Sequence, residues 1–180
     1  MDIFILRHGE AGKKLTTGNN KDSERPLTAA GQKEVAEIAN SFKELEIKFD
    51  LIISSPLKRA HQTAAIVAKT LKKEKKMEDW NELKPEGNKQ ELYRKLSSST
   101  QFKQYSSVLI VGHEPYLTDM TSDIISDRKG GSGGGGHIIL KKAGLARIGI
   151  TSSTPTSSTL PSLHGELKWL LTPKHMRNMR

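Results

Sequence analysis

Three short apolar runs, none of them interrupted by a polar residue, constrain the fold of this chain more than any other feature. They occupy positions 3–6, 51–53 and 108–111. Strands that are covered on both faces have this composition, because a parallel sheet lies between two layers of helices. Stretches with helical spacing separate the runs, and this alternation predicts a mostly parallel sheet. We therefore expect a three-layer α/β/α sandwich, and a length of 180 residues fits a single domain over 1–180.

Helical patterns fill the intervals between these runs. Thr28 suits the N-cap of a helix that continues to about Glu46, because apolar residues recur along it at intervals of three and four. Pro56 suits the first position of a second helix. Two shorter helices are predicted near 88–98 and 116–126. These helices would form the two outer layers of the sandwich.

The C-terminal third has a different pattern. Strands are predicted over 137–142, 145–150 and 165–171, the first two as a pair. Ser, Thr and Pro dominate 151–162, so we expect a flexible loop there. Segment 130–136 consists of glycine and one serine, so we expect it to be flexible too and assign it no function.

The composition excludes several classes of protein. The chain contains no cysteine, so disulfides, thiolate zinc sites and cysteine nucleophiles are excluded. No apolar run approaches the roughly 18 residues of a membrane helix. No cationic stretch precedes the first apolar run, as it would in a signal peptide. We therefore expect a cytoplasmic protein with no membrane partner.

The charge balance points to an anionic partner. Lysine and arginine number 29 against 20 acidic residues, so the net charge is 29 − 20 = +9. Such a charge suits a nucleic acid, and it also suits a phosphorylated substrate. The densest basic run, 72–76, includes Glu74 and is typical of a solvated helix end. Only 5% of residues are aromatic, and none alternates with the basic residues to stack on bases. We therefore expect no nucleic-acid partner.

Cationic and imidazole side chains follow the predicted strands. Arg7 and His8 end the first strand, and His113 follows the third. Arg59 opens the helix after the second. Ligands bind beyond the carboxyl ends of parallel strands, so we expect these groups to meet at one edge of the sheet. The Arg7 cation would lower the pKa of the His8 imidazole and keep it neutral, as a nucleophile must be. The carbonyl of Gly9 is placed to fix the tautomer of that ring.

Four motifs occur in order over residues 1 to about 117. They are Arg7-His8-Gly9-Glu10-Ala11, Arg25-Pro26-Leu27-Thr28 with Gly31, Ser54-Ser55-Pro56-Leu57-Lys58-Arg59-Ala60 with Gln62-Thr63-Ala64, and Val111-Gly112-His113-Glu114-Pro115. Together they resemble the motifs of the histidine phosphatase superfamily, the phosphoglycerate-mutase-like enzymes. The short interval between Arg59 and His113, and the ending at 165–173, are similar to the SixA-like phosphohistidine phosphatases.

This resemblance implies a phosphoglycerate-mutase-like fold without a large lid insertion, and a phosphatase mechanism. His8 would attack phosphorus and form a phosphohistidine intermediate, which water then hydrolyses. Arg7, Arg25 and Arg59 would hold the phosphoryl oxygens, and His113 would donate a further hydrogen bond. Because arginines can balance the charge of the phosphoryl group, we expect neither a cofactor nor a metal.

The proton donor for the leaving group is the least determined part of this implied site. Glu82 lies about where larger relatives carry their acid, and Glu86 is a second candidate. The family pattern N-E-x-x-x-G is matched in part by Asn81, Glu82 and Gly87. An alkoxide leaving group needs such an acid, whereas a phosphorylated imidazole needs it less. A solvated loop carboxylate is the alternative interpretation of Glu82.

The leading hypothesis is a monomeric phosphatase for protein phosphohistidine, of the phosphorelay type. One alternative is a broader phosphatase for small phosphate esters or polyphosphate, since the net charge of +9 also suits a polyanion. Another is a non-catalytic module that binds phosphoproteins on the same fold; the presence of His8 and Arg7 argues against it. The histidines outside the motifs are expected to be structural or exposed: His61, His137, His164 and His175.

Overall fold

A six-stranded sheet forms the centre of the fold in a computed structural model that describes residues 1–13, 22–98, 104–126, 138–154 and 162–179. In these ranges the strands are β1 Asp2–Arg7, β2 Leu51–Ser54, β3 Met77–Asp79, β4 Ser107–Gly112, β5 Leu145–Thr154 and β6 Ser162–Leu171. The α-helices are α1 Ala29–Glu44, α2 Lys58–Thr70, α3 Lys89–Ser98, α5 Tyr116–Ile125 and α6 Pro173–Asn178. Short 3-10 helices are η1 Asp22–Glu24, η2 Glu74–Lys76 and η3 Asn81–Leu83.

The sheet is mostly parallel, as the sequence predicts. Its order is β3-β2-β4-β1-β5-β6. β3, β2, β4 and β1 pair in parallel, while β5 pairs antiparallel with both β1 and β6. The carboxyl ends of β1, β2 and β4 therefore lie at the same edge of the sheet.

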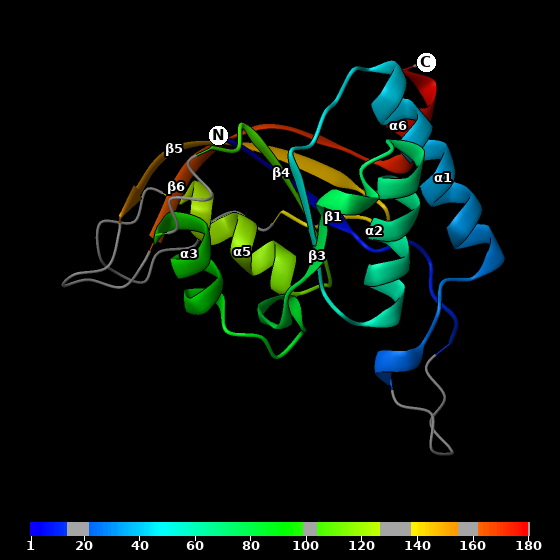
Figure 1. Ribbon diagram of the computed structural model, residues 1–180, viewed down its shortest axis with the longest axis horizontal. Helices are drawn as coiled ribbons and strands as arrows, with labels where there is room; N and C mark the ends of the chain where they lie inside the picture. Colours follow the sequence, from blue (N-terminus) through cyan, green and yellow to red (C-terminus); the bar gives the residue numbers. More distant parts are fainter. Residues whose placement is uncertain (14–21, 99–103, 127–137, 155–161, 180) are drawn as a thin grey trace.

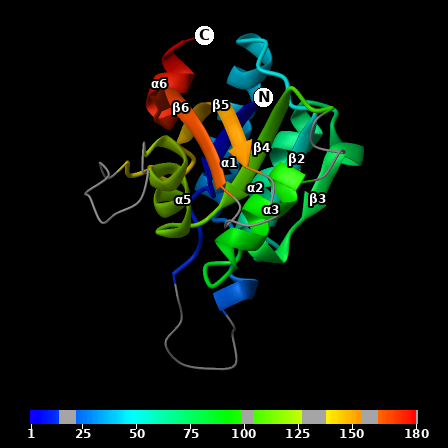
Figure 2. The same cartoon turned by 90° about the vertical axis from the view of Figure 1, so that its left-hand side faces the viewer.

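Helices cover both faces of the sheet (Figures 1 and 2). α3 and α5 pack on one face, in a core cluster that includes Ile3 and Ile5 of β1. α1, α2 and α6 pack on the other, in a cluster that includes Phe4 and Leu6. Successive side chains of β1 thus enter opposite cores, which explains why this run contains no polar residue. The predicted three-layer sandwich is confirmed.

The boundaries of the first two helices differ slightly from prediction. α1 ends at Glu44, two residues before the predicted end. Pro56 is not the first residue of α2, because Leu57 is its N-cap and the helix begins at Lys58. The Ser55 hydroxyl oxygen accepts a hydrogen bond from the Leu57 N–H at 3.3 Å, which holds the chain in a turn before the helix. No helix in the described ranges is both long and apolar enough to cross a membrane.

The predicted strand over 137–142 is wrong for 138–142, and residue 137 lies outside the described residues. At Leu140 the backbone bonds to side chains, and the Lys141 carbonyl accepts from the Gly144 N–H in a turn at 2.8 Å. The Leu140 N–H donates to Glu114 Oε1 at 3.2 Å, and the Leu140 carbonyl accepts from Arg7 at 2.8 Å. The apolar run at 138–140 is compatible with a strand, but these two charged side chains take the backbone groups that a ladder would need.

The predicted loop at 151–162 is also wrong in part. Residues 151–154 extend β5, and they pair with the beginning of β6. The rest of that loop, 155–161, lies outside the described residues, as does the glycine segment 130–136. β3 is absent from the sequence prediction, because this three-residue edge strand contains two exposed acidic side chains and no apolar run.

α1 packs closely on the loop that follows β1. The Thr28 hydroxyl oxygen accepts a hydrogen bond from the Gly31 N–H at 2.9 Å, which confirms the predicted N-cap. The Thr28 N–H donates to the carbonyl of Glu10 at 2.9 Å. A Cβ atom on Gly31 would overlap that same backbone carbonyl. Gly31 therefore allows α1 to approach the segment two residues beyond His8.

We expect Gly31→Ala to lower the free energy of unfolding by about 1–2 kcal/mol, although alanine in a helix is normally favoured over glycine. The reason is the overlap with the Glu10 backbone, which has no flexible end to move away. Urea denaturation at pH 7 measures this. Gly12→Ala is the matched control, because a Cβ there has its nearest neighbour, Pro26 O, at 4.0 Å. A more stable Gly31→Ala protein would contradict the prediction.

Candidate active site

His8 follows β1 directly and is 8% exposed. Its Nδ1 lies 2.7 Å from the Gly9 carbonyl oxygen, so Nδ1 donates to Gly9 and carries the proton. The lone pair of the neutral ring is then on Nε2, which accepts a hydrogen bond from Arg59 Nε at 3.3 Å. The contact predicted between Gly9 and the ring is present, and it points the nucleophilic nitrogen at a guanidinium group.

The pKa of His8 is lowered to about 4. Burial is the largest cause, because the charged form of the ring loses its hydration. The Gly9 carbonyl raises the pKa, and the positive charges of Arg59, Arg7 and Arg25 lower it again. The direction agrees with the sequence prediction, but the neighbouring cation is a smaller cause than burial. His8 is therefore neutral at physiological pH.

A second imidazole faces His8 from the end of β4. The His113 ring centroid is 5.1 Å from that of His8, and the residue is 2% exposed. Its Nε2 lies 2.9 Å from Ser55 Oγ, while its Nδ1 is buried with no hydrogen-bond partner among the described residues. Burial, and next the charge of Arg59, lowers the pKa of His113 to about 3. The ring is neutral and has one nitrogen available to a substrate oxygen.

Arg59 is the second residue of α2, and its side chain contacts Asp22 of η1. NH1 of Arg59 donates to the Asp22 carbonyl at 2.9 Å, and NH2 forms an ion pair with its carboxylate at 3.1 Å. The same carboxylate forms an ion pair with Arg25 at 3.2 Å. Asp22 therefore holds two guanidinium groups together that would otherwise repel each other. Sequence reasoning missed Asp22, because it lies in a polar segment without a motif.

Arg7 and Arg25 are anchored by backbone carbonyls. Arg7 donates to Leu140 at 2.8 Å, and Arg25 donates to Gly12 at 3.0 Å. The Nε of each is buried with no hydrogen-bond partner in the described part of the chain. The charges of all three arginines lower the pKa of both imidazoles, so the three guanidinium groups lie near both rings. The structure thus brings together five of the predicted site residues: Arg7, His8, Arg25, Arg59 and His113. Such a cluster of donors suits a tetrahedral dianion such as a phosphoryl group.

Glu82, the predicted proton donor, has other partners. Its Oε1 forms an ion pair with Lys95 of α3 at 2.7 Å, and the Lys95 ammonium lies 4.8 Å from the centroid of the Trp80 ring. Burial by itself raises the pKa of Glu82, but the hydrogen bond and charge of Lys95, with a backbone hydrogen bond, outweigh it and lower the pKa. The other oxygen, Oε2, is buried and has no hydrogen-bond partner among the described residues. Glu82 is therefore held as a carboxylate.

The spacing of Asn81, Glu82 and Gly87 has a steric reason. A Cβ atom on Gly87 would overlap the carbonyl of Glu82, so the turn closes only around a glycine. Glu86, the second candidate acid, lies in this turn with an exposed side chain. In the described ranges, no group of three or more His, Asp or Glu side chains is placed to hold a metal ion.

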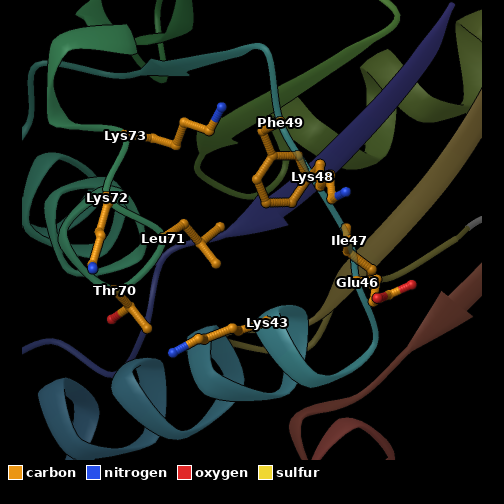
Figure 3. A pocket seen from close by; sticks show the side chains of 9 residues that line it. All are labelled: Lys43, Glu46, Ile47, Lys48, Phe49, Thr70, Leu71, Lys72 and Lys73. Atoms are coloured by element: carbon orange, nitrogen blue, oxygen red, sulfur yellow. The ribbon is translucent and has the colours of Figure 1, made fainter.

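A cavity of about 470 Å³ lies at the other end of α2, and Figure 3 shows the side chains around it. Lys43, Lys48, Lys72 and Lys73 are among its lining residues. α2 has 13 residues and carries Arg59 in its first turn, so Thr70 in the cavity wall lies about 16 Å along the helix axis from Arg59. Lys43, Lys72 and Lys73 lie near the C-terminal ends of α1 and α2, where positive charge is stabilising. The basic run at 72–76 therefore belongs to a helix end and not to the candidate site.

Comparison with known proteins agrees with this geometry. Residues 3–107 match the histidine phosphatase superfamily (branch 1). Phosphohistidine phosphatase SixA of Escherichia coli K12 is 31% identical over 124 residues, which cover 69% of this chain and 74% of that protein. An uncharacterized protein of Picosynechococcus sp. is 30% identical over 152 residues, which cover 84% of this chain and 86% of that protein.

The fold is also found among solved structures. The structure of the protein histidine phosphatase SixA complexed with tungstate matches with a TM-score of 0.76 at 24% identity, and the match covers 100% of both chains. The sequence match to the superfamily spans the motifs around His8, Arg25 and Arg59, and the geometry adds His113 to them. By sequence, fold and the arrangement of these side chains, the chain belongs to the histidine phosphatase superfamily.

Proposed function

We propose that this chain is a metal-independent phosphatase that uses His8 as its nucleophile and removes phosphoryl groups from protein phosphohistidine. The observation that carries the proposal is the buried neutral imidazole of His8, whose Nε2 accepts a hydrogen bond from Arg59 and which also lies near Arg7 and Arg25. Two comparisons support it. The similar protein of Escherichia coli is a phosphohistidine phosphatase, and the similar solved structure holds tungstate, a tetrahedral oxyanion like phosphate.

The reaction has two displacements at phosphorus. In the first, the Nε2 lone pair of His8 forms a bond to phosphorus while the bond to the substrate nitrogen breaks. The three guanidinium groups and His113 bind the equatorial oxygens, where negative charge develops. In the second, water attacks phosphorus and gives up a proton, the bond to His8 breaks, and inorganic phosphate leaves. His8 returns to its neutral state.

The state of Glu82 favours phosphohistidine over phosphate esters. An ester leaves as an alkoxide and needs an acid to protonate it. Lys95 holds Glu82 as a carboxylate, which makes it a poor acid at neutral pH. A phosphorylated imidazole takes its proton from solvent before the P–N bond breaks, so it depends less on Glu82. We retain Glu82 as the donor for a slower reaction with esters.

Polyphosphate is the second candidate substrate. Its leaving group is phosphate, which departs without strong acid assistance, and the net charge of +9 suits a polyanion. It differs from phosphohistidine in having no protein attached. An assay that includes both substrates therefore separates these candidates.

The first expected outcome concerns phosphate release in excess EDTA. We expect wild type to release phosphate from a phosphohistidine peptide at least tenfold faster than from phosphoserine peptide or polyphosphate. His8→Ala should lose at least about 1000-fold, because the nucleophile is gone. Arg59→Ala should lose about 100-fold or more, because it stabilises transition-state charge. Near wild-type release by His8→Ala would contradict the covalent mechanism.

Lys95→Met tests the state of Glu82. Removing the ammonium raises the pKa of Glu82, while methionine keeps the contact with Trp80. We expect phosphoserine hydrolysis to increase several-fold and phosphohistidine hydrolysis to stay within about twofold. In the double variant Lys95→Met/Glu82→Gln the gain should disappear. A gain that persists in the double variant would show that Glu82 is not the donor.

The neutral state of His8 predicts a pH dependence of stability. The folded chain has a pKa of about 4 at His8, against 6.5 for a free histidine. Between pH 6.5 and 4 the unfolded chain binds a proton that the folded chain excludes, so the free energy of unfolding falls as the pH falls through this window. The share of this fall that His8 causes is up to about 3 kcal/mol, and His8→Gln removes it. The free energy of unfolding of His8→Gln, measured by urea denaturation, should therefore depend less steeply on pH. If the free energy of unfolding fell equally with pH in wild type and in His8→Gln, the prediction would be contradicted.

A further inference from the structure

A second cavity, of about 430 Å³, borders the candidate active site. It lies between the turn that contains Glu86 and the first turn of α5, and Pro115 and Tyr116 contribute to its wall. These two residues follow His113 closely, and the Leu117 N–H donates to the His113 carbonyl at 2.9 Å. Its volume falls within the range of ligand pockets, and one or two side chains of a partner would fill it.

Tyr116 supplies a polar group that lacks a partner. The residue is 5% exposed, and its hydroxyl is buried without a hydrogen-bond partner among the described residues. An unpaired buried hydroxyl is unfavourable, so such a group in a cavity wall points to a ligand that completes its bonding. Burial and the nearby negative charge of Glu82 raise the pKa of Tyr116, so the hydroxyl keeps its proton. Gly87 also lines the cavity, and a Cβ atom on it would overlap the carbonyl oxygen of Glu82, so the cavity adjoins the segment that carries the implied proton donor.

The unpaired charges on the rim of this cavity are negative. Glu86 and Asp119 both line it with exposed side chains, and neither forms an ion pair with the residues that the structure describes. Lys89 also lines it, but its ammonium is paired with Asp123 at 2.8 Å. Two free carboxylates therefore stand beside a cavity that adjoins a cluster of arginines. A ligand that spans both must present a phosphoryl group at one end and a cation at the other.

We propose that this cavity binds the side chain next to the phosphorylated residue of the substrate protein and selects lysine or arginine there. The proposal rests on the protein phosphohistidine phosphatase function proposed above. A long basic side chain fits, because its carbon stem can pack on Pro115 and the Tyr116 ring while its cation reaches Glu86 and Asp119. The net charge of +9 by itself would favour an acidic flanking residue. A measured preference for a basic flanking residue would therefore be due to the carboxylates of Glu86 and Asp119 and not to the net charge.

Three phosphohistidine peptides, identical except for Lys, Ala or Glu on both sides of phosphohistidine, test this. We expect wild type to hydrolyse the Lys peptide with a kcat/KM about 10-fold above that of the Glu peptide. In Glu86→Gln/Asp119→Asn this ratio should fall to about 1–2. The matched control is Glu46→Gln/Glu74→Gln, which removes two exposed carboxylates away from this cavity and should keep the wild-type ratio. Tyr116→Phe should raise KM for the Lys and Ala peptides without lowering the free energy of unfolding, because its hydroxyl has no protein partner to lose.

Two further measurements separate failure of the subsite from failure of the proposed function. Phosphoimidazole has no flanking residues, so its His8-dependent hydrolysis tests the phosphatase alone; no turnover of phosphoimidazole or of any peptide would overturn the proposed function. Equal kcat/KM for the three peptides in wild type would overturn the subsite and leave the phosphatase. Binding of the same peptides to His8→Ala, by fluorescence anisotropy, decides the subsite without turnover: tighter binding of the Lys peptide supports it, and equal Kd values overturn it.

Discussion

Three guanidinium groups around two buried imidazoles are the constraint on which the rest of this site depends. Like charges at close range repel strongly where water is partly excluded. The chain offsets this repulsion with oxygen acceptors: the Asp22 carboxylate lies between Arg25 and Arg59, and the carbonyls of Gly12 and Leu140 accept from the other guanidinium donors. Each acceptor belongs to a loop or a short 3-10 turn. The paths of these irregular segments are therefore set by arginine donors and not by the sheet.

The difference between segments held by the sheet and segments held by arginine side chains explains which parts of the fold could be predicted from the sequence. The strands β1, β2 and β4 are buried on both faces, so their composition identifies them without knowledge of their neighbours. Residues 138–140 are also apolar, but Arg7 and Glu114 bond to the backbone of Leu140, and the local sequence carries no sign of partners so far along the chain. β3 has the opposite difficulty, because its position at the edge of the sheet leaves two of its three side chains exposed, and these two are acidic.

The candidate site also contains residues that could be predicted from the sequence and residues that could not. Arg7, His8, Arg59 and His113 are placed by the ends of strands and the start of a helix, so the topology rule that brings strand ends to one edge also brings these side chains together. Asp22 has its role through contact with Arg59, 37 residues along the chain, as well as with nearby Arg25, and Lys95 has its role through contact with Glu82. The pKa of His8 shows the same limit: the neighbouring arginine indicated the direction, but the larger cause, burial, exists only in the folded chain.

The net charge of this protein and the local charge beside the candidate site would affect different steps of substrate binding, the encounter and the selection. A charge of +9 acts over distances comparable to the size of the molecule and would raise the rate at which a phosphorylated partner of the proposed kind arrives. At contact range this attraction no longer discriminates, because in the proposed function the arginines would bind a phosphoryl group whatever is attached to it. Discrimination then depends on what lies beside the phosphoryl group. The free carboxylates of Glu86 and Asp119 and the unpaired hydroxyl of Tyr116 are the groups placed to provide it. A positively charged protein can thus select a positively charged neighbour of its phosphorylated residue, since overall charge governs encounter and the adjoining cavity governs fit.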